Sequence, residues 1–210
     1  MGLLIRAAAT DRPRPIRSVR GTVKATASRN HIEPGSQWKD NKAPLTLGSA
    51  CSGLGTEALC LQRYLRVPFD HVFVCERSKH CQRLLADTYT CQHYFPDCKD
   101  LSVRAPTVDI FVAGPPCQPW SRAGLMMGQK DERFSPFVAV VRYIAEKRPK
   151  LCIIENVKDL SSKNNVKVIE CLKAHLTPWY HVDYTVLNSS GWIPQNRERV
   201  YIVCRQHLSS

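Results

Sequence analysis

From residue 45 onward, short apolar runs alternate with longer segments in which apolar residues recur every three or four positions. Short apolar runs are typical of buried strands, and the longer spacing is typical of amphipathic helices. Their alternation predicts βαβ units and a mostly parallel sheet. The predicted strands are 45–50, 71–75, 109–113, 151–155, 180–187 and 200–204, and the predicted helices are 56–65, 79–88, 134–146 and 165–175. The last two strands flank a turn-rich segment, which predicts that they pair antiparallel.

The first part of the chain lacks this pattern. Residues 1–42 contain nine Lys or Arg and three acids, a net charge of +6, which is half of the +12 of the whole chain. We therefore predict a disordered basic leader and linker over residues 1–43 and a single globular domain over residues 44–206. The leader is compatible with an organellar transit peptide, a basic arm on nucleic acid or a solvated tail.

The amino-acid composition limits the classes of protein to which the chain can belong. With 43% hydrophobic and 23% charged residues in 210, the chain has enough apolar material for a core, and it contains no run of about 20 apolar residues that would span a membrane. The excess of Lys and Arg favours a polyanionic partner. None of the ten cysteines forms a CxxC pair and no signal peptide opens the chain, so we expect reduced thiols, mostly in the core, and no metal site.

A glycine turn follows the first predicted strand. Gly53 and Gly55 lie in SACSGLGTEA (residues 49–58), where a tight turn and the following helix N-terminus can bring free N–H groups close to a ligand. Glu76 ends the second strand about 20 residues later, where a carboxylate can accept both hydroxyls of a ribose. Because residues 53–58 also fit the pattern G-x-G-x-x-A, a nicotinamide-dependent oxidoreductase stays among the alternatives, as does an ordinary turn beside an exposed acid.

Cys117 lies in AGPPCQPWS (residues 113–121), just beyond the buried strand 109–113. Ligands of open α/β sheets bind at the carboxyl ends of the strands. Pro115, Pro116 and Pro119 remove backbone freedom and N–H donors around the thiol. This setting favours a positioned, reactive cysteine, and the alternative is a buried structural thiol in a proline-rich turn.

Charged side chains follow the next two strands. Glu155, in IIENV, ends strand 151–155, so it is expected near Cys117, although pairing with Lys158 is the alternative. Arg197 and Arg199, in PQNRERV, are two residues apart on a forming strand and should share one face. That face is either directed toward the same sheet edge or open to solvent.

Taken in order, the SGLG turn, PCQPWS, ENV and QNRERV resemble the motifs of the cytosine-C5 DNA methyltransferase family, over about residues 45–205. The resemblance implies a class I methyltransferase sheet, of Rossmann-like α/β type, with S-adenosylmethionine as the methyl donor. It implies cytosine in DNA as the substrate, with RNA as an alternative.

The resemblance also assigns roles to residues. It implies that Cys117 is the nucleophile that adds to C6 of cytosine, that Glu155 engages the ring, and that Arg197 and Arg199 are the family's motif arginines, with Arg199 contacting the base. Asp100 is the expected contact to the donor's adenine, and Asp97 is the competing alignment. The implied donor-binding residues are Cys51, Gly53, Leu54, Gly55, Glu76, Asp100 and Pro115. The implied base-binding residues are Pro116, Gln118, Ser121 and Asn156.

The sequence also departs from the family pattern. Ser49 stands where the family has an acid, Cys51 where it has an aromatic residue, and Thr56 where it has a third glycine. Only six residues follow strand 200–204, so we expect the family's target recognition domain and final motifs to be absent. The hypotheses are a truncated reading frame, a split enzyme completed by a second polypeptide, or an inactive module that binds the donor, nucleic acid or a partner methyltransferase. We expect a nuclear location, and the Arg-rich leader keeps an organelle open.

Overall fold

The computed structural model describes residues 43–116 and 135–207. The chain divides into two units, Met1–Ile32 and Glu33–Ser210, and every described residue belongs to the second. Residues 1–42 of the predicted leader therefore lie outside the described residues, and so do Cys117, Gln118 and Ser121.

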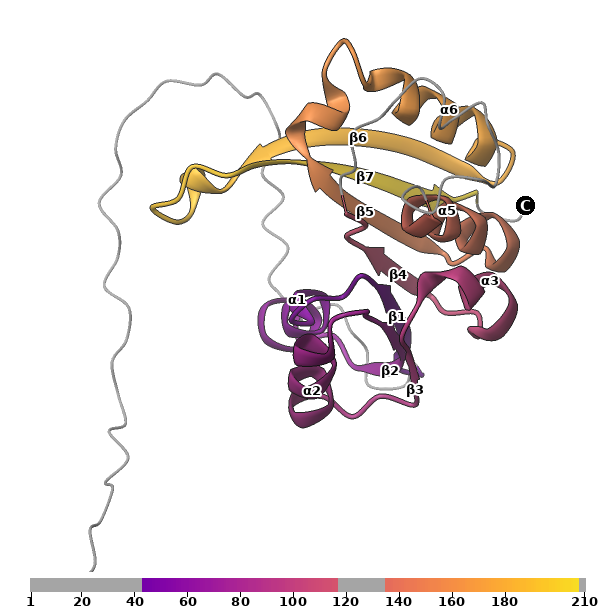
Figure 1. Cartoon of the computed structure of the whole chain (residues 1–210), viewed down its shortest axis with the longest axis vertical. Helices are drawn as coiled ribbons and strands as arrows, with labels where there is room; N and C mark the ends of the chain where they lie inside the picture. The colour runs from indigo at the N-terminus through magenta and orange to yellow at the C-terminus, as the bar shows by residue number, and fades with distance from the viewer. Residues whose placement is uncertain (1–42, 117–134, 208–210) are drawn as a thin grey trace, which may run out of the picture. The chain divides into compact units, whose positions relative to one another are not determined.

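Seven strands form one sheet in the order β3-β2-β1-β4-β5-β7-β6 (Figure 1). They are β1 (Leu45–Ala50), β2 (Phe69–Cys75), β3 (His93–Phe95), β4 (Ile110–Ala113), β5 (Leu151–Val157), β6 (Tyr180–Asn188) and β7 (Glu198–Gln206). β1 to β5 pair in parallel, and β7 runs antiparallel to both β5 and β6. This confirms the predicted α/β class and its antiparallel end. The standard dinucleotide-binding order, 3-2-1-4-5-6, does not contain such an inserted antiparallel strand.

The helical segments match the predicted ones, with additions. They are α1 (Thr56–Leu59), η1 (Cys60–Leu65), α2 (Lys79–Thr88), η2 (Cys98–Asp100), α3 (Leu101–Arg104), α5 (Ser135–Lys147), η4 (Lys158–Ser161), α6 (Val166–Leu176) and η5 (Ser189–Gly191). The segment expected as one helix over 56–65 is a short α-helix that continues as a π-helix. β3, η2 and α3 were not predicted, because each is only three or four residues long.

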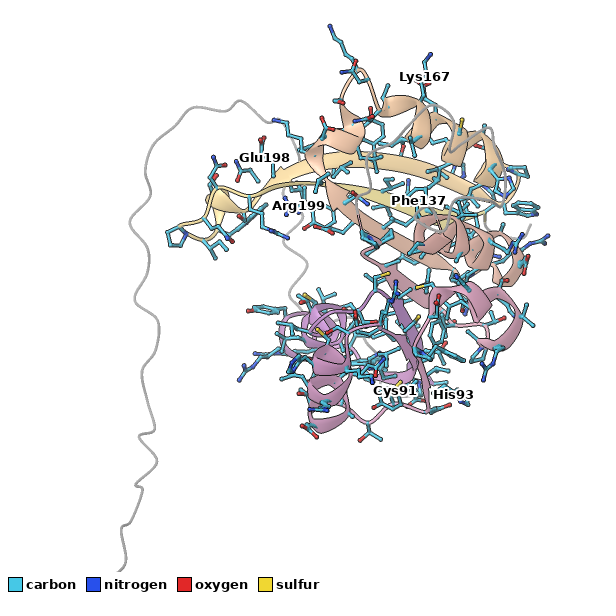
Figure 2. All side chains as sticks on the ribbon, viewed as in Figure 1. Cys91, His93, Phe137, Lys167, Glu198 and Arg199 are labelled. Atoms are coloured by element: carbon cyan, nitrogen blue, oxygen red, sulfur yellow. The ribbon has the colours of Figure 1, made fainter. Side chains whose placement is uncertain are left out.

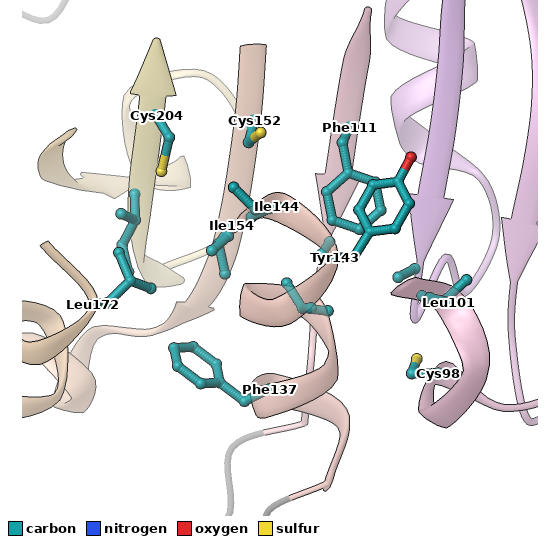
Figure 3. Close-up of a cluster of buried hydrophobic side chains, with 14 of the residues drawn as sticks. Cys98, Leu101, Phe111, Phe137, Tyr143, Ile144, Cys152, Ile154, Leu172 and Cys204 are labelled. Carbon is teal, nitrogen blue, oxygen red and sulfur yellow. The ribbon is translucent and has the colours of Figure 1, made fainter. Parts of the chain in front are cut away.

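The main core lies between the sheet and α3, α5 and α6. Phe73 of β2, Phe111 of β4 and Tyr143 of α5 are fully buried, and the Tyr143 ring lies 5.5 Å from the Phe73 ring and 4.5 Å from the Phe111 ring, centroid to centroid. Figure 3 shows Phe111 and Tyr143 packed together, with Ile144 and Ile154 beside them. This packing fixes β4 and β5 against α5, and it therefore fixes the strand ends that carry the predicted site.

The opposite face of the sheet is covered less completely. A small cluster of Leu47, Ala58 and Leu61 packs beneath α1 and η1. On β5 and β7, the residues that alternate with the main core are only partly buried, and none of them belongs to either cluster of buried side chains; they are Leu151, Ile153, Tyr201 and Val203. None of the helices among the described residues is long and apolar enough to cross a membrane.

Candidate functional site

The strand register brings the carboxyl ends of the central parallel strands to one edge of the sheet. Ala50 of β1 pairs with Cys75 of β2 and with Ala113 of β4, and Ala113 pairs with Ile154 of β5. The residue that follows each of these therefore lies at the same edge of the sheet, and these residues are Cys51, Glu76, Gly114 and Glu155. Three of the predicted site residues are thus brought to one edge by strand register alone.

The glycine turn after β1 is held by the carboxylate after β2. Gly53 and Gly55 have φ angles of 53° and 73°, in the left-handed region that glycine tolerates. The Gly53 N–H donates to Glu76 Oε2 at 2.8 Å, and the Ser78 N–H donates to Glu76 Oε1 at 2.7 Å. Each carboxylate oxygen has a second lone pair for another donor. Glu76 is therefore held in place with accepting capacity left over.

A cavity of about 290 Å³ opens beside this carboxylate. Its wall includes Cys51, Cys75, Glu76, Asp97, Cys98 and Pro116. Leu54, a predicted donor-binding residue in the glycine turn, is 64% exposed. Asp97 caps η2 by accepting the Lys99 N–H at 2.9 Å, and the side chain of Asp100, at the end of η2, lies outside the described residues.

Asn156 ties the end of β5 to the loop after β4. Its side chain is buried, donates to the Pro115 carbonyl oxygen at 3.1 Å and accepts the Val157 N–H at 2.9 Å. Pro115 is buried, and Pro116 is exposed. The amide predicted to contact a base is thus placed beneath the loop, where it holds the backbone that leads to Cys117.

Glu155 and Arg199 form an ion pair at the other end of this edge. The Arg199 Nε lies 3.0 Å from Glu155 Oε1, and the two side chains are 21% and 33% exposed. Because Glu155 is opposite Tyr201 in the β5–β7 ladder and Val157 is opposite Arg199, the ion pair joins diagonal neighbours on one face. Burial, with the nearby Glu155 carboxylate adding, raises the pKa of Tyr201.

The two arginines of the QNRERV segment are placed differently. Arg199 lies within β7 (Figure 2), whereas Arg197 precedes β7 and is exposed. Only Arg199 is part of the strand, because β7 begins at Glu198. Both arginines lie near Tyr201, where their charges oppose the rise in its pKa. Lys158, the alternative partner considered for Glu155, instead pairs with Glu198 at 2.8 Å.

Two further observations bear on the site. A larger cavity, of about 690 Å³, lies between α5 and α6 and shares no lining residue with the site at the strand ends. Within residues 43–116 and 135–207, no group of three or more His, Cys, Asp or Glu side chains is arranged to hold a metal ion. Sequence reasoning missed Cys75 and Cys98 in the cavity wall, because their approach depends on η2.

Comparisons with known proteins concern the family and the fold of the chain. The model of the C-5 cytosine-specific DNA methylase family matches residues 45–209. The type II methyltransferase M.NlaX of Neisseria lactamica is 34% identical over 149 residues, which are 66% of this chain and 48% of that protein. M.Bsp6I of Bacillus sp. (strain RFL6) is 35% identical over 143 residues, 64% of this chain and 44% of that protein. The crystal structure of the S. pombe Dnmt2 methyltransferase shares the fold, with a TM-score of 0.58 and 17% identity over 79% of this chain and 50% of that one. The chain thus spans about half the length of these relatives.

Proposed function

This chain belongs to the C-5 cytosine-specific DNA methylase family, and from that premise we propose that it carries the catalytic half of an enzyme that methylates C5 of cytosine in DNA. The observation that carries the proposal is the Glu155–Arg199 pair, 3.0 Å apart, at the same sheet edge as the Glu76 carboxylate. The Glu155–Arg199 pair suits a flipped pyrimidine, and the Glu76 carboxylate suits the hydroxyls of a nucleoside.

Residues around the cavity beside Glu76 would hold S-adenosylmethionine, which, when bound, supplies the methyl group. Glu76 is oriented by the Gly53 and Ser78 N–H groups and keeps free lone pairs for ribose hydroxyls. The left-handed turn at Gly53 lets the backbone approach a ligand without a Cβ atom in the way. Asp97 and Asp100 are the candidate adenine contacts.

The Glu155–Arg199 pair suits the pyrimidine ring. Cytosine C5 is weakly nucleophilic, so a thiolate must first add to C6 and make C5 enamine-like. As negative charge develops on the ring, Glu155, which must first take up a proton from solvent, donates it toward N3, and Arg199 stabilises O2. Their ion pair keeps both side chains at the sheet edge before the base arrives, and flipping the base out of the helix costs a few kcal/mol.

Cys117 supplies the thiolate in this proposal. It follows Pro116, which lines the cavity, and Asn156 holds the preceding residue, Pro115. Once C5 carries the methyl group, loss of the C5 proton to a base restores the C5–C6 double bond and expels the Cys117 thiolate. The Asn156 hydrogen bond thus acts on the approach of the nucleophile, and its predicted contact with the base stays a prediction.

Trapping the adduct tests the proposal. In DNA that contains 5-fluorocytosine, C5 carries fluorine in place of the proton that must be lost, so an active enzyme with S-adenosylmethionine stays covalently attached to it. The assay supplies the chain together with the remaining half of an M.NlaX-type relative. We expect a covalent complex with the wild-type chain and with the Cys171→Ser control on the exposed face of α6, and none with Cys117→Ser. Absence of a complex with the wild-type chain would reject the proposal.

A second polypeptide that supplies target recognition is the partner we propose. One observation supports it: the apolar residues on one face of β5 and β7 are only partly buried. Formation of the fluorocytosine complex by this chain without an added half would count against such a partner. A complex on fluorinated RNA and not on DNA would assign the RNA alternative, and donor binding without any complex would assign the inactive module.

A further inference from the structure

Three cysteines meet at the wall of the cavity beside Glu76. The Sγ atom of Cys98 lies 3.4 Å from the Cys75 Sγ and 3.7 Å from the Cys51 Sγ. The three residues come from the end of β2, from η2 and from the turn after β1. Their approach therefore depends on the tertiary structure, because 23 and 47 residues of chain separate the partners.

Strand register explains why the sulfur atoms converge. Cys75 is the last residue of β2 and pairs with Ala50 on one side and with Phe95 on the other. Cys51 directly follows Ala50 and has a φ angle of 52°, and Cys98 follows Phe95 by three residues. Each neighbouring strand thus delivers one thiol to the end of β2.

The cluster differs from an inert core thiol in its access to solvent. Cys75 and Cys98 are 1% and 7% exposed, but Cys51 is only partly buried, and all three residues line the same cavity. Cys152 and Cys204 provide a contrast. They are directly opposite each other in the β5–β7 ladder, and both are 0% exposed (Figure 3).

Hydrogen bonding makes Cys98 the acidic member of the cluster. Cys98 contacts both other sulfur atoms, and in each contact either atom can be the donor. Accepting from the Cys51 and Cys75 thiols lowers the pKa of Cys98, although burial and Asp97 oppose the shift. The same hydrogen bonds, with burial adding, raise the pKa of the Cys51 and Cys75 thiols. A thiolate is the nucleophilic and oxidisable form of cysteine.

We propose that Cys75 and Cys98 are a reversible oxidation site, at which a hydroperoxide converts the two thiols into a disulfide and thereby weakens donor binding. The Cys98 thiolate attacks the peroxide, takes one oxygen as a sulfenic acid and releases hydroxide. The Cys75 thiol then attacks the Cys98 sulfur, which forms the S–S bond and releases water. In sum, two thiols and one hydrogen peroxide give one disulfide and two waters.

The expected effect on the cavity follows from the geometry. An S–S bond is about 2.05 Å long, so the sulfur atoms must come closer than their 3.4 Å contact. Cys75 precedes Glu76, and Cys98 follows Asp97, so the two wall carboxylates move with the sulfurs. The part of the inference that concerns donor binding rests on the proposed function, and the formation of the disulfide does not.

Mass spectrometry of the full chain tests the oxidation site. Reduced protein receives one equivalent of hydrogen peroxide, is blocked with N-ethylmaleimide and is cleaved with trypsin and a protease that cuts before aspartate, which separates Cys91 from Cys98. We expect one peptide pair joined through Cys75 and Cys98 and released by dithiothreitol, with Cys152 and Cys204 still reduced. Recovery of Cys75 or Cys98 as the maleimide adduct, or a bond from Cys98 to Cys51 instead, overturns the assignment.

Variants and a binding titration complete the test. Cys98→Ser should abolish the disulfide, and Cys171→Ser should leave it unchanged. In a Cys117→Ser background, which removes oxidation of the proposed nucleophile, the oxidised chain should bind S-adenosylmethionine about tenfold more weakly than the reduced chain. Equal binding by both forms overturns the effect on the donor. A reduced chain that binds no donor rejects the proposed function, while the disulfide is judged by mass spectrometry alone.

Discussion

The two glycines of the turn after β1 differ in the space around them. A matched pair of alanine substitutions therefore separates the cost of backbone conformation from the cost of packing. Both residues have positive φ angles, 53° for Gly53 and 73° for Gly55. A Cβ atom at Gly53 would have no heavy atom within 4 Å, whereas one at Gly55 would lie 2.7 Å from Tyr89 Cε2 and 2.8 Å from Leu85 Cδ2. Gly53→Ala therefore tests backbone conformation alone, and Gly55→Ala tests conformation and packing together.

The magnitudes follow from these two contributions. An L-residue in the left-handed region costs about 1–2 kcal/mol, so Gly53→Ala should lower the free energy of unfolding by about that amount. Overpacking adds about 1–3 kcal/mol, which brings the expected loss for Gly55→Ala to about 2–5 kcal/mol. Leu85 is 1% exposed and has little room to move, which favours the upper half of that range.

Urea unfolding followed by circular dichroism measures both losses. A third variant, Tyr89→Ala, removes one of the two contacts, so the cost of Gly55→Ala should be smaller in that background, and the difference is the coupling energy of the pair. Equal losses for Gly53→Ala and Gly55→Ala would refute the argument from packing. A coupling energy of zero would show that Tyr89 does not set the cost.

Three further substitutions test polar groups that are buried or partly buried. Tyr143→Phe should lower the free energy of unfolding by about 1–2 kcal/mol in urea, because the Tyr143 hydroxyl donates to the Pro106 carbonyl oxygen at 2.7 Å. Burial lowers the pKa of His71 from 6.5 to about 4, so the folded chain binds this proton less readily than the unfolded one. Stability should therefore be complete above pH 6.5 and fall by up to about 3 kcal/mol toward pH 4, and thermal melts of His71→Leu should lose that pH dependence. Asp109→Ala should cost about 1–3 kcal/mol by the same urea assay, because the Asp109 carboxylate accepts both the Thr46 N–H and the Thr46 hydroxyl at 2.8 Å.

Long elements could be predicted from the sequence because their patterns repeat. The strands 45–50 and 151–155 and the helix 79–88 were located to within two residues, since an apolar run or a helical spacing marks each one. The pattern contains no signal for the change from α- to π-helix after Leu59, because segments of four and six residues are too short to separate the two periodicities. β3 escaped prediction because Phe95 is its only buried residue.

The candidate site also contains residues that the sequence could place and residues that it could not. Glu76 and Glu155 could be placed at one sheet edge because each directly follows or ends an apolar run, and parallel strands finish at the same edge. The thiol cluster could not be placed, because it requires the register of β1, β2 and β3 and the short η2. The burial of Asn156 also required the structure, since an asparagine at a strand end gives no sign of whether it faces a ligand or the loop beneath.

The direction of β7 explains how an arginine reaches the carboxylate at the end of β5. A parallel strand beside β5 would bring its carboxyl end to this edge, and the residues at its beginning would lie at the opposite edge. β7 is antiparallel, so its beginning lies at this edge, and Arg199, its second residue, is opposite Val157, the last residue of β5. The ion pair with Glu155 is the diagonal contact that this register allows. The β6–β7 hairpin thus has a chemical consequence, because it delivers a cation to an edge where the parallel strands β2 and β5 contribute carboxylates.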